Sequence, residues 1–168
     1  MDLVLVRHAI AEEREVFART GKPDELRPLT LRGKRRMNRA AAGLRSLLPA
    51  IDVLASSPLV RAAESAAIIS EAYGGLEVVE VAELAPETDS QHLLGWLQSL
   101  SAVSTVVIVG HEPSFSGHVA WLAARADEPF VEFKKGGACL LTFYGEIYAG
   151  GATLRWLLTP AQLRALED

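Results

Sequence analysis

The sequence predicts an α/β domain in which helices cover both faces of a mainly parallel sheet. Apolar, β-branched runs alternate with stretches of helical period up to residue 110, and this alternation is typical of parallel strands joined by helices. Two more apolar runs then follow one another directly, which predicts an antiparallel pair at one edge of the sheet. The chain has 168 residues, enough for a substantial core, so a single domain spanning residues 1–168 is expected.

Six segments are expected to be strands because each is short, apolar and ends in a loop. Helical stretches separate the first four, whereas the segment EIYAGG is expected to turn the last two into a hairpin. In chain order the six segments are Leu3–Val6, Ile51–Ser56, Leu76–Val81, Ser104–Gly110, Ala138–Tyr144 and Thr153–Leu158.

The first two long connections each predict a helix. Between Thr30 and Leu48 apolar residues recur every three or four positions, while four arginines between positions 32 and 39 occupy another face. This pattern predicts an amphipathic helix capped by Thr30. In the next connection, Ser57 and Pro58 are expected to be the N-cap and first residue of a helix that stops at the glycine pair 74–75.

Two later helices follow the third and fourth strands. Asp89 or Ser90 is expected to cap a helix through HLLGWLQSL, and the dipeptide at 112–113 is expected to begin one through HVAWLAARA. These helices contain His92 and His118, which match no motif. Both histidines are therefore expected to be ordinary surface or core residues.

Charge and cysteine content exclude several classes of protein. Lysines and arginines number 17 against 21 acidic residues, and the resulting net charge of −4 does not favour nucleic acid or a membrane surface as a partner. Cys139 is the single cysteine, which excludes a disulfide framework and a zinc site of several thiolates. We expect it to be a buried apolar residue in a reducing compartment, the cytoplasm. Arg7 interrupts the first apolar run too early for a signal peptide or membrane span.

Charged and imidazole side chains follow the predicted strands where each strand ends. Arg7 and His8 come directly after the first strand, and His111 follows Gly110 at the end of the fourth. Arg61 falls in the first turn of the helix after the second strand, where the helix dipole disfavours a cation that has no anionic ligand. Because the carboxyl ends of parallel strands share one edge, we expect Arg7, His8, Arg61 and His111 to line one pocket.

Such a pocket suits a dianionic phosphoryl group. Guanidiniums bind phosphate oxygens in a bidentate way, and helix N-termini favour anions. A neutral imidazole can attack phosphorus in line, forming a phosphohistidine that water then cleaves, while the second imidazole and the arginines balance the charge. A neighbouring arginine also disfavours protonation of the nucleophile.

An ordered set of segments along nearly the whole chain resembles the histidine phosphatase superfamily, and more closely its short members, the phosphohistidine phosphatases of the SixA type. Each segment alone is weak evidence, but the set in this order is specific. The segments are RHA at 7–9, RPLTLRG at 27–33, SSPLVRAAESA at 56–66, ELAPE at 83–87, VGHEPSFSG at 109–117, KGGACLLTF at 135–143 and WLLTP at 156–160.

The resemblance implies a three-layer α/β/α sandwich of the phosphoglycerate mutase type, and a reaction that uses no metal and no cofactor. It implies His8 as the nucleophile, Arg7 and Arg61 as phosphate ligands, and His111 as the second histidine that touches the phosphoryl group. The chain departs from many members after the first strand, because RHAIAEER lacks the asparagine that contacts phosphate there.

A second departure concerns the general acid. Larger members place an acidic glutamate after the third strand, and here Glu83, Glu87 and Asp89 all lie near that position. Glu83 is the candidate, although a carboxylate there is more often an ordinary loop residue. A sugar phosphate needs a protonated leaving group, whereas a phosphorylated imidazole leaves more easily. Without a clear acid, and with a chain too short to enclose a small molecule, a phosphohistidine in a protein is the expected substrate.

Two alternatives remain open at this stage. The first is a phosphatase of small phosphate esters, or a mutase, although a mutase must close its pocket around a diphosphorylated intermediate. The second is a module that binds phosphorylated partners without turnover, although binding alone needs no nucleophile in line with the phosphate. A nucleic-acid role would rest on the single basic helix, and no aromatic residues interleave with its cations.

The arginine face of that helix, from Arg32 to Arg39, has two interpretations. Charged helix faces are most often simply solvated. The sharper hypothesis is a docking surface for an acidic partner domain that presents a phosphohistidine.

Overall fold

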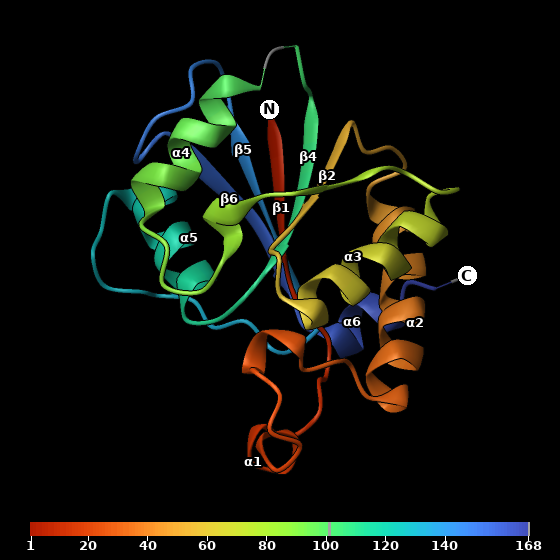
Figure 1. Ribbon diagram of the computed structural model, residues 1–168. Coiled ribbons are helices and arrows are strands. Elements are labelled where there is room, and N and C mark those ends of the chain that lie inside the picture. The colour runs from red at the N-terminus through yellow and green to blue at the C-terminus, as the bar shows by residue number, and fades with distance from the viewer. Residues whose placement is uncertain (101, 168) are drawn as a thin grey trace.

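A six-stranded sheet lies at the centre of the protein (Figure 1). The structure is a computed structural model that describes residues 1–100 and 102–167. Each strand matches a segment expected from the sequence, with ends that differ by up to two residues. The strands are β1 (Asp2–Arg7), β2 (Val53–Ser56), β3 (Val78–Glu80), β4 (Thr105–Gly110), β5 (Ala138–Phe143) and β6 (Ala152–Leu158).

The strand order is β3-β2-β4-β1-β5-β6, and the first four strands in this order are parallel. β5 pairs with β1 antiparallel and β6 pairs with β5, so the expected antiparallel pair forms one edge. Leu5 of β1 lies between Ile108 of β4 and Cys139 of β5. β1 is therefore an interior strand, and burial on both of its faces explains its uninterrupted apolar run.

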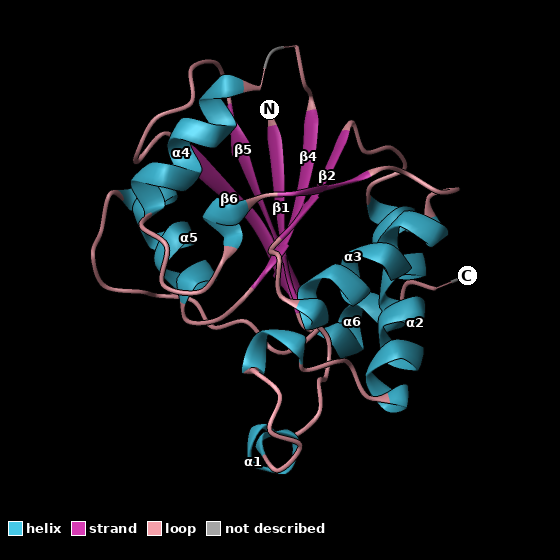
Figure 2. Cartoon of the chain, viewed as in Figure 1, coloured by secondary structure: helices cyan, strands magenta, loops and turns pink. Residues whose placement is uncertain are grey.

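Helices cover both faces of this sheet and complete three layers (Figure 2). The helices are α1 (Arg14–Ala18), α2 (Leu31–Leu47), α3 (Val60–Ala72), α4 (Ser90–Ser99), α5 (Ser114–Ala124) and α6 (Pro160–Arg164), with short 3-10 helices η1 (Asp24–Leu26) and η2 (Ala82–Leu84). One face of the sheet carries the predicted amphipathic helix, α2, with α3 and α6 packed beside it, and the opposite face carries α4 and α5. No helix in the described ranges is both long and apolar enough to cross a membrane.

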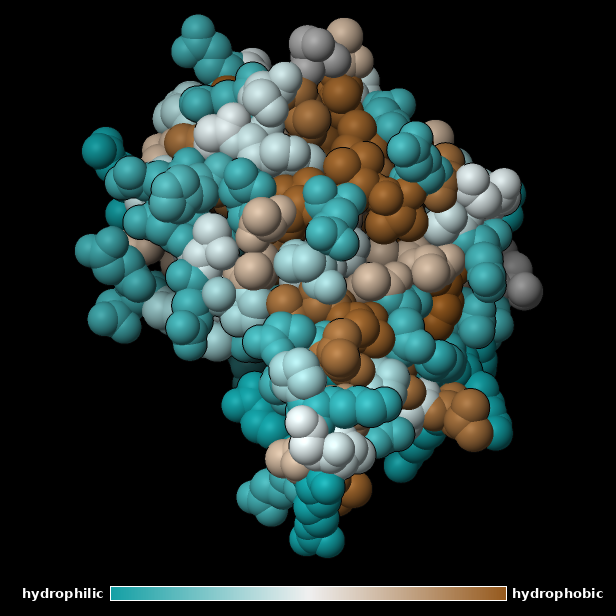
Figure 3. All heavy atoms as spheres, viewed as in Figure 1, coloured by the Kyte–Doolittle hydropathy of each residue, from teal (hydrophilic) through white to brown (hydrophobic). Residues whose placement is uncertain are grey.

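Alternate residues of β1 divide the core into two halves. Val4 and Val6 pack with the α2 and α3 layer, whereas Leu3 and Leu5 pack with the α4 and α5 layer. Figure 3 shows hydrophilic residues over the helical layers and hydrophobic residues gathered in the strip between them, along the edge of the sheet.

Two of the predicted helix caps are confirmed, and one is wrong. Thr30 accepts a hydrogen bond from the Gly33 N–H, and Asp89 caps α4. Ser57 is not the cap of α3, which begins at Val60 after Leu59. The Ser57 N–H still donates to the carbonyl of Val109 in β4, so the chain stays extended through Ser57 and turns only afterwards. The Ser57 hydroxyl is thereby left for the site described below.

The contact between α2 and α6 depends on Gly43, and we predict that Gly43→Ala is strongly destabilising. A Cβ at this position would overlap with the carbonyl oxygen of Leu163 in α6. Overpacking of this kind typically lowers the free energy of unfolding by about 1–3 kcal/mol. The loss should lie at the upper end here, because a backbone atom cannot move aside as a flexible side chain can. Gly95→Ala in α4 is the matched control, because nothing lies within 4 Å of its Cβ and the helix should gain stability. Equal urea midpoints for the two variants would contradict this packing.

Candidate active site

A pocket opens beyond the carboxyl ends of the parallel strands, next to the segment that carries α1 at the lower end of Figure 1. It encloses about 1,030 Å³, with its open mouth included. Arg7, His8, Arg61 and His111 all line it, although they come from three separate segments of the chain. The structure therefore brings together the four side chains that were expected from the sequence to share a pocket.

One ring nitrogen of His8 makes a hydrogen bond to the backbone, and the other has no backbone partner. The residue is buried, with 7% of its surface exposed. Its backbone N–H continues the sheet by donating to the carbonyl of Gly110. Nδ1 lies 2.7 Å from the carbonyl oxygen of Ala9. Because a carbonyl only accepts, Nδ1 carries the proton and Nε2 carries the lone pair. This tautomer leaves Nε2 as a nucleophilic nitrogen.

The position of His8 is fixed through its neighbour. The Ala9 N–H donates to the hydroxyl of Ser65, 3.0 Å away, and that hydroxyl donates to the carbonyl of Arg61. The end of β1 is thus tied to α3 at the turn that carries Arg61. Motion of His8 relative to Arg61 is restricted by this shared serine.

His111 faces His8 across a short gap. The centroids of the two imidazole rings are 5.1 Å apart, with 55° between the ring planes. Nε2 of His111 lies 2.8 Å from the hydroxyl of Ser57, which also accepts the Leu59 N–H. Nδ1 is buried and has no hydrogen-bond partner in the described parts of the chain. Ser57 therefore orients the ring, and Nδ1 remains available for a ligand.

Each of the two predicted arginines has one anchored and one unpaired nitrogen. Nη1 of Arg7 donates to the carbonyl of Phe133, and Nη1 of Arg61 donates to the carbonyl of Asp24. The Nε atoms of both arginines are buried without a hydrogen-bond partner among the described residues. Buried guanidinium donors of this kind favour an anionic ligand, because an unpaired buried charge is costly.

Arg27 is a third arginine of the pocket, buried like Arg61, and it was not among the site residues predicted from the sequence. Its Nε donates to Oδ1 of Asp24 at 2.8 Å, and its Nη1 donates to the carbonyl of Glu12. Oδ2 of Asp24 also lies 3.3 Å from Nη1 of Arg61. One aspartate therefore holds two pocket arginines. Arg27 begins the RPLTLRG segment, but it lies in a long irregular stretch whose path the sequence does not define.

The structure places Glu83 and Glu87 differently relative to the pocket. Glu83 is not among the residues that line the pocket, because it lies in η2, whereas the loop that follows brings Glu87 to the pocket instead. The Glu87 N–H donates to the hydroxyl of Ser114, and its φ of +67° marks a sharp turn of the backbone. Glu112 also lines the pocket, but both of its carboxylate oxygens accept hydrogen bonds, from Phe133 and Ser116.

The electrostatics of the pocket keep both histidines neutral. Burial lowers the pKa of His8 to about 3, assisted by the charges of the pocket arginines and opposed by the hydrogen bond to Ala9. The pKa of His111 is also lowered to about 3, mainly by burial and further by the charges of His8 and Arg61. At neutral pH the site therefore combines neutral imidazoles with guanidinium cations. This combination can bind an oxyanion and attack it.

The lowered pKa values predict that acid destabilises the protein. Burial also lowers the pKa of His118 to about 4, so His8, His111 and His118 bind protons below pH 6.5 when unfolded but not when folded. The free energy of unfolding should fall as the pH decreases from about 6.5 towards 3, by up to about 1.4 kcal/mol per pH unit for each histidine. Urea midpoints at pH 7 and pH 5 test this. His8→Gln should weaken the dependence and His92→Gln, at an exposed position, should not; equal midpoints for the wild type would contradict it.

The described residues contain no group of three or more histidine, cysteine, aspartate or glutamate side chains placed to hold a metal ion. His92 is exposed, whereas His118 is buried and contacts Ser90, so neither joins the pocket. Cys139 is buried in β5, as expected.

Comparison with known proteins gives a consistent result. The family model described as histidine phosphatase superfamily (branch 1) matches residues 3–89. An uncharacterized protein of Picosynechococcus sp. (strain PCC 7002) is 31% identical over 139 residues, which is 82% of each chain.

Solved structures share the fold over nearly their whole length. The protein histidine phosphatase SixA, solved with tungstate, superimposes with a TM-score of 0.82 at 23% identity and covers 97% of this chain and 99% of its own. The α-ribazole phosphatase of Shigella flexneri gives 0.71 at 18% identity, with 95% and 97% covered. A phosphoserine phosphatase of Entamoeba histolytica, solved with 3-phosphoglyceric acid, gives 0.69 at 19% identity, with 96% and 98% covered.

These findings confirm the phosphoglycerate mutase-like α/β/α fold and the similarity to SixA. The likeness to solved structures rests on the fold, whereas the family model and the cyanobacterial relative rest on the sequence itself. The chain belongs to the histidine phosphatase superfamily, branch 1, and this membership supports a hydrolase activity.

Proposed function

We propose that the protein is a phosphohistidine phosphatase that removes phosphate from a histidine of a partner protein through a covalent phospho-His8 intermediate. The observation that carries the proposal is the state of His8. Its Nδ1–H is fixed on the Ala9 carbonyl, and burial keeps the ring neutral. Nε2 therefore has its lone pair available beside two arginines whose Nε atoms are unpaired.

The reaction follows from this geometry in two steps. Nε2 of His8 attacks phosphorus in line, forming a P–N bond while the bond between phosphorus and the substrate nitrogen breaks. Water then attacks the phosphohistidine and releases inorganic phosphate, which regenerates His8. Arg7, Arg61 and Arg27 offset the charge of the phosphoryl oxygens in both steps, and Nδ1 of His111 contacts one of them.

The pocket carboxylates favour a substrate whose leaving group departs easily. Glu112 has both oxygens engaged as acceptors, and Glu87 lies exposed at the rim. An alkoxide leaving group needs firm proton donation, whereas the leaving imidazole of a phosphohistidine needs less. Glu87 replaces Glu83 as the candidate proton donor, because Glu87 lines the pocket and Glu83 does not. The pocket also opens to solvent, so it can receive a side chain presented by a protein.

Hydrolysis of small phosphate esters is the second candidate function. It is supported by the structural likeness to an α-ribazole phosphatase and to a phosphoserine phosphatase. Both candidates use the same nucleophile and the same phosphate ligands. Within the site, the lack of a strong proton donor among the carboxylates is therefore the feature that favours phosphohistidine over an ester. A third candidate, binding of phosphate without turnover, leaves the unprotonated Nε2 of His8 without a role.

Phosphate release from a histidine-phosphorylated protein and from p-nitrophenyl phosphate, both with EDTA present, separates these functions. Under the proposal the phosphoprotein has the higher kcat/KM, and EDTA changes neither rate because the reaction needs no metal. A higher kcat/KM for the ester would support the second candidate. Tight binding of the phosphoprotein with no release of phosphate would mean that the site only recognises phosphate.

A further inference from the structure

Arginines gather on the outer surface of α2 and α6, beside the active-site pocket. We call this group the basic surface; it consists of Arg32, Arg35, Arg36, Arg39 and Arg164, with Leu31 at one end. The first four arginines and Leu31 line a shared shallow groove. Leu31 is 73% exposed, so the groove presents one apolar side chain among its cations. Arg39 pairs with Glu167, and no ion pair joins the other four within the described residues.

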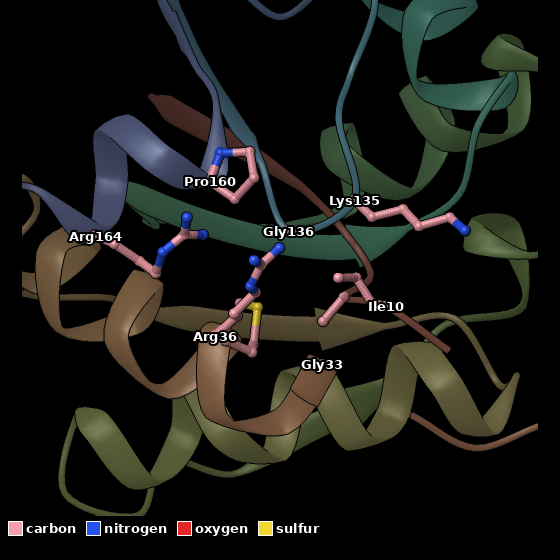
Figure 4. Close-up of a pocket in the computed structure, with 9 residues that line it drawn as sticks. Ile10, Gly33, Arg36, Lys135, Gly136, Pro160 and Arg164 are labelled. Atoms are coloured by element: carbon pink, nitrogen blue, oxygen red, sulfur yellow. The ribbon is translucent and has the colours of Figure 1, made fainter. Parts of the chain in front are cut away.

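A small hollow lies between α2 and α6 at the inner side of the basic surface (Figure 4). The side chains of Arg36 and Arg164 both point into it, next to Gly136 and Pro160, whereas Lys135 extends in another direction. The walls on the side of β1 are Ala9 and Ile10, which directly follow His8. Two cations from different helices therefore share a space that no described carboxylate lines.

Arg164 shows that this space lacks a counter-ion. Its Nη1 atom is buried and has no hydrogen-bond partner among the described residues. Burial and the neighbouring charges of Arg36 and Arg39 lower the pKa of Arg164. An anion that entered the hollow would satisfy the unpaired N–H and reduce the repulsion between the guanidiniums.

The size of the hollow restricts what can enter it. It leaves about 20 Å³ for the centre of a water-sized group, which is the space of about one water molecule. A nucleotide is therefore excluded, whereas a side-chain carboxylate can reach in with one oxygen. The adjoining groove with Leu31 supplies the apolar contact and the arginines that are typical of protein interfaces.

The basic surface is continuous with the active site. Lys135 lines both the active-site pocket and the hollow, and Arg36 lines both the hollow and the groove. A protein whose phosphohistidine lies over His8 would therefore extend across these cations. Because they are largely unpaired, the complementary surface on such a protein is acidic.

We propose that the basic surface docks an acidic face of the phosphorylated partner protein, and that the hollow between Arg36 and Arg164 receives one of its carboxylates. The proposal rests on the proposed function for the identity of the partner, but the surface can be tested without turnover. It selects the docking hypothesis over a merely solvated helix face, and it adds Leu31 and Arg164 to the arginines expected from the sequence.

The first test measures binding of a decaglutamate peptide to the wild type at low ionic strength. Arg32→Glu/Arg35→Glu should weaken binding by at least about tenfold, and Arg36→Gln/Arg164→Gln should weaken it by about tenfold through loss of the carboxylate site. Arg45→Glu/Arg155→Glu is the matched control, because it changes the net charge as much as the first variant at exposed positions outside the basic surface. Thermal unfolding of all variants checks that they are folded.

The second test measures turnover. With Arg32→Glu/Arg35→Glu, kcat/KM for a histidine-phosphorylated protein should fall at least about tenfold through KM, while kcat/KM for p-nitrophenyl phosphate stays unchanged. If the wild type hydrolyses only the ester, the proposed function fails, and the peptide measurement still decides the docking surface. Equal peptide binding by the reversed variant and its control would overturn the docking proposal. Equal competition by inorganic phosphate or an oligonucleotide would also overturn it, because the surface would then bind any anion.

Discussion

Replacing His8 with alanine is expected to reduce turnover of every phosphorylated substrate by at least about 10⁴-fold, because the reaction loses its nucleophile. His8 is placed by backbone bonds of β1 and through Ala9, so the variant should keep the pocket intact. The remaining arginines should still bind the substrate. Binding of the phosphoprotein should therefore persist while the release of phosphate is lost.

Denaturation in alkaline SDS during turnover provides a second measurement of the same prediction, because phosphohistidine is stable in base and is hydrolysed by acid. The wild type should retain radioactive phosphate on His8 after reaction with a labelled phosphoprotein, and His8→Ala should retain none. His92→Ala is the matched control, because His92 is an exposed histidine of α4 outside the pocket. Full labelling of His8→Ala, or activity equal to that of the control, would show that another group attacks phosphorus.

The strands and the two histidines of the site could be predicted from the sequence for one physical reason. Buried strands of a parallel sheet are uninterrupted apolar runs, so a polar residue such as His8 or His111 marks where the strand ends. Strand ends of this kind meet at one edge whatever the lengths of the helices between them. The two histidines of the pocket could therefore be predicted from patterns within short stretches of the sequence.

The same reasoning does not predict Arg27 and Asp24, and it does not choose Glu87 among the three acidic residues near the end of the third strand. Arg27, Asp24 and Glu87 belong to irregular segments whose paths are set by side-chain hydrogen bonds, such as the contact of Arg27 with Asp24. The error at Ser57 has a similar cause. Serine followed by proline is a common beginning of a helix, but here the N–H of Ser57 is held by β4 and the helix starts later. Local preference was overridden by a tertiary hydrogen bond.

The second prediction with a large expected effect concerns Arg61. Its side chain is only 4% exposed, with one nitrogen on Asp24 and its Nε unpaired. Arg61→Ala should lower kcat/KM by about 10²–10³-fold, as loss of one preorganised donor to a reacting oxyanion typically does. Both kcat and the affinity for inorganic phosphate should fall. Arg45→Ala, at the far end of α2, is the control and should change neither.

Arg61→Lys distinguishes a role for geometry from a role for charge. An ammonium group keeps the positive charge, but it is a compact point charge that lacks the planar fork of the guanidinium. In the wild type this fork donates to Asp24 with Nη1 while Nε stays free for the substrate. A lysine can satisfy one of these partners, so it should restore less than a tenth of the activity lost in Arg61→Ala. Recovery close to wild type would mean that Arg61 acts only through its charge, and that its attachment to Asp24 does not serve catalysis.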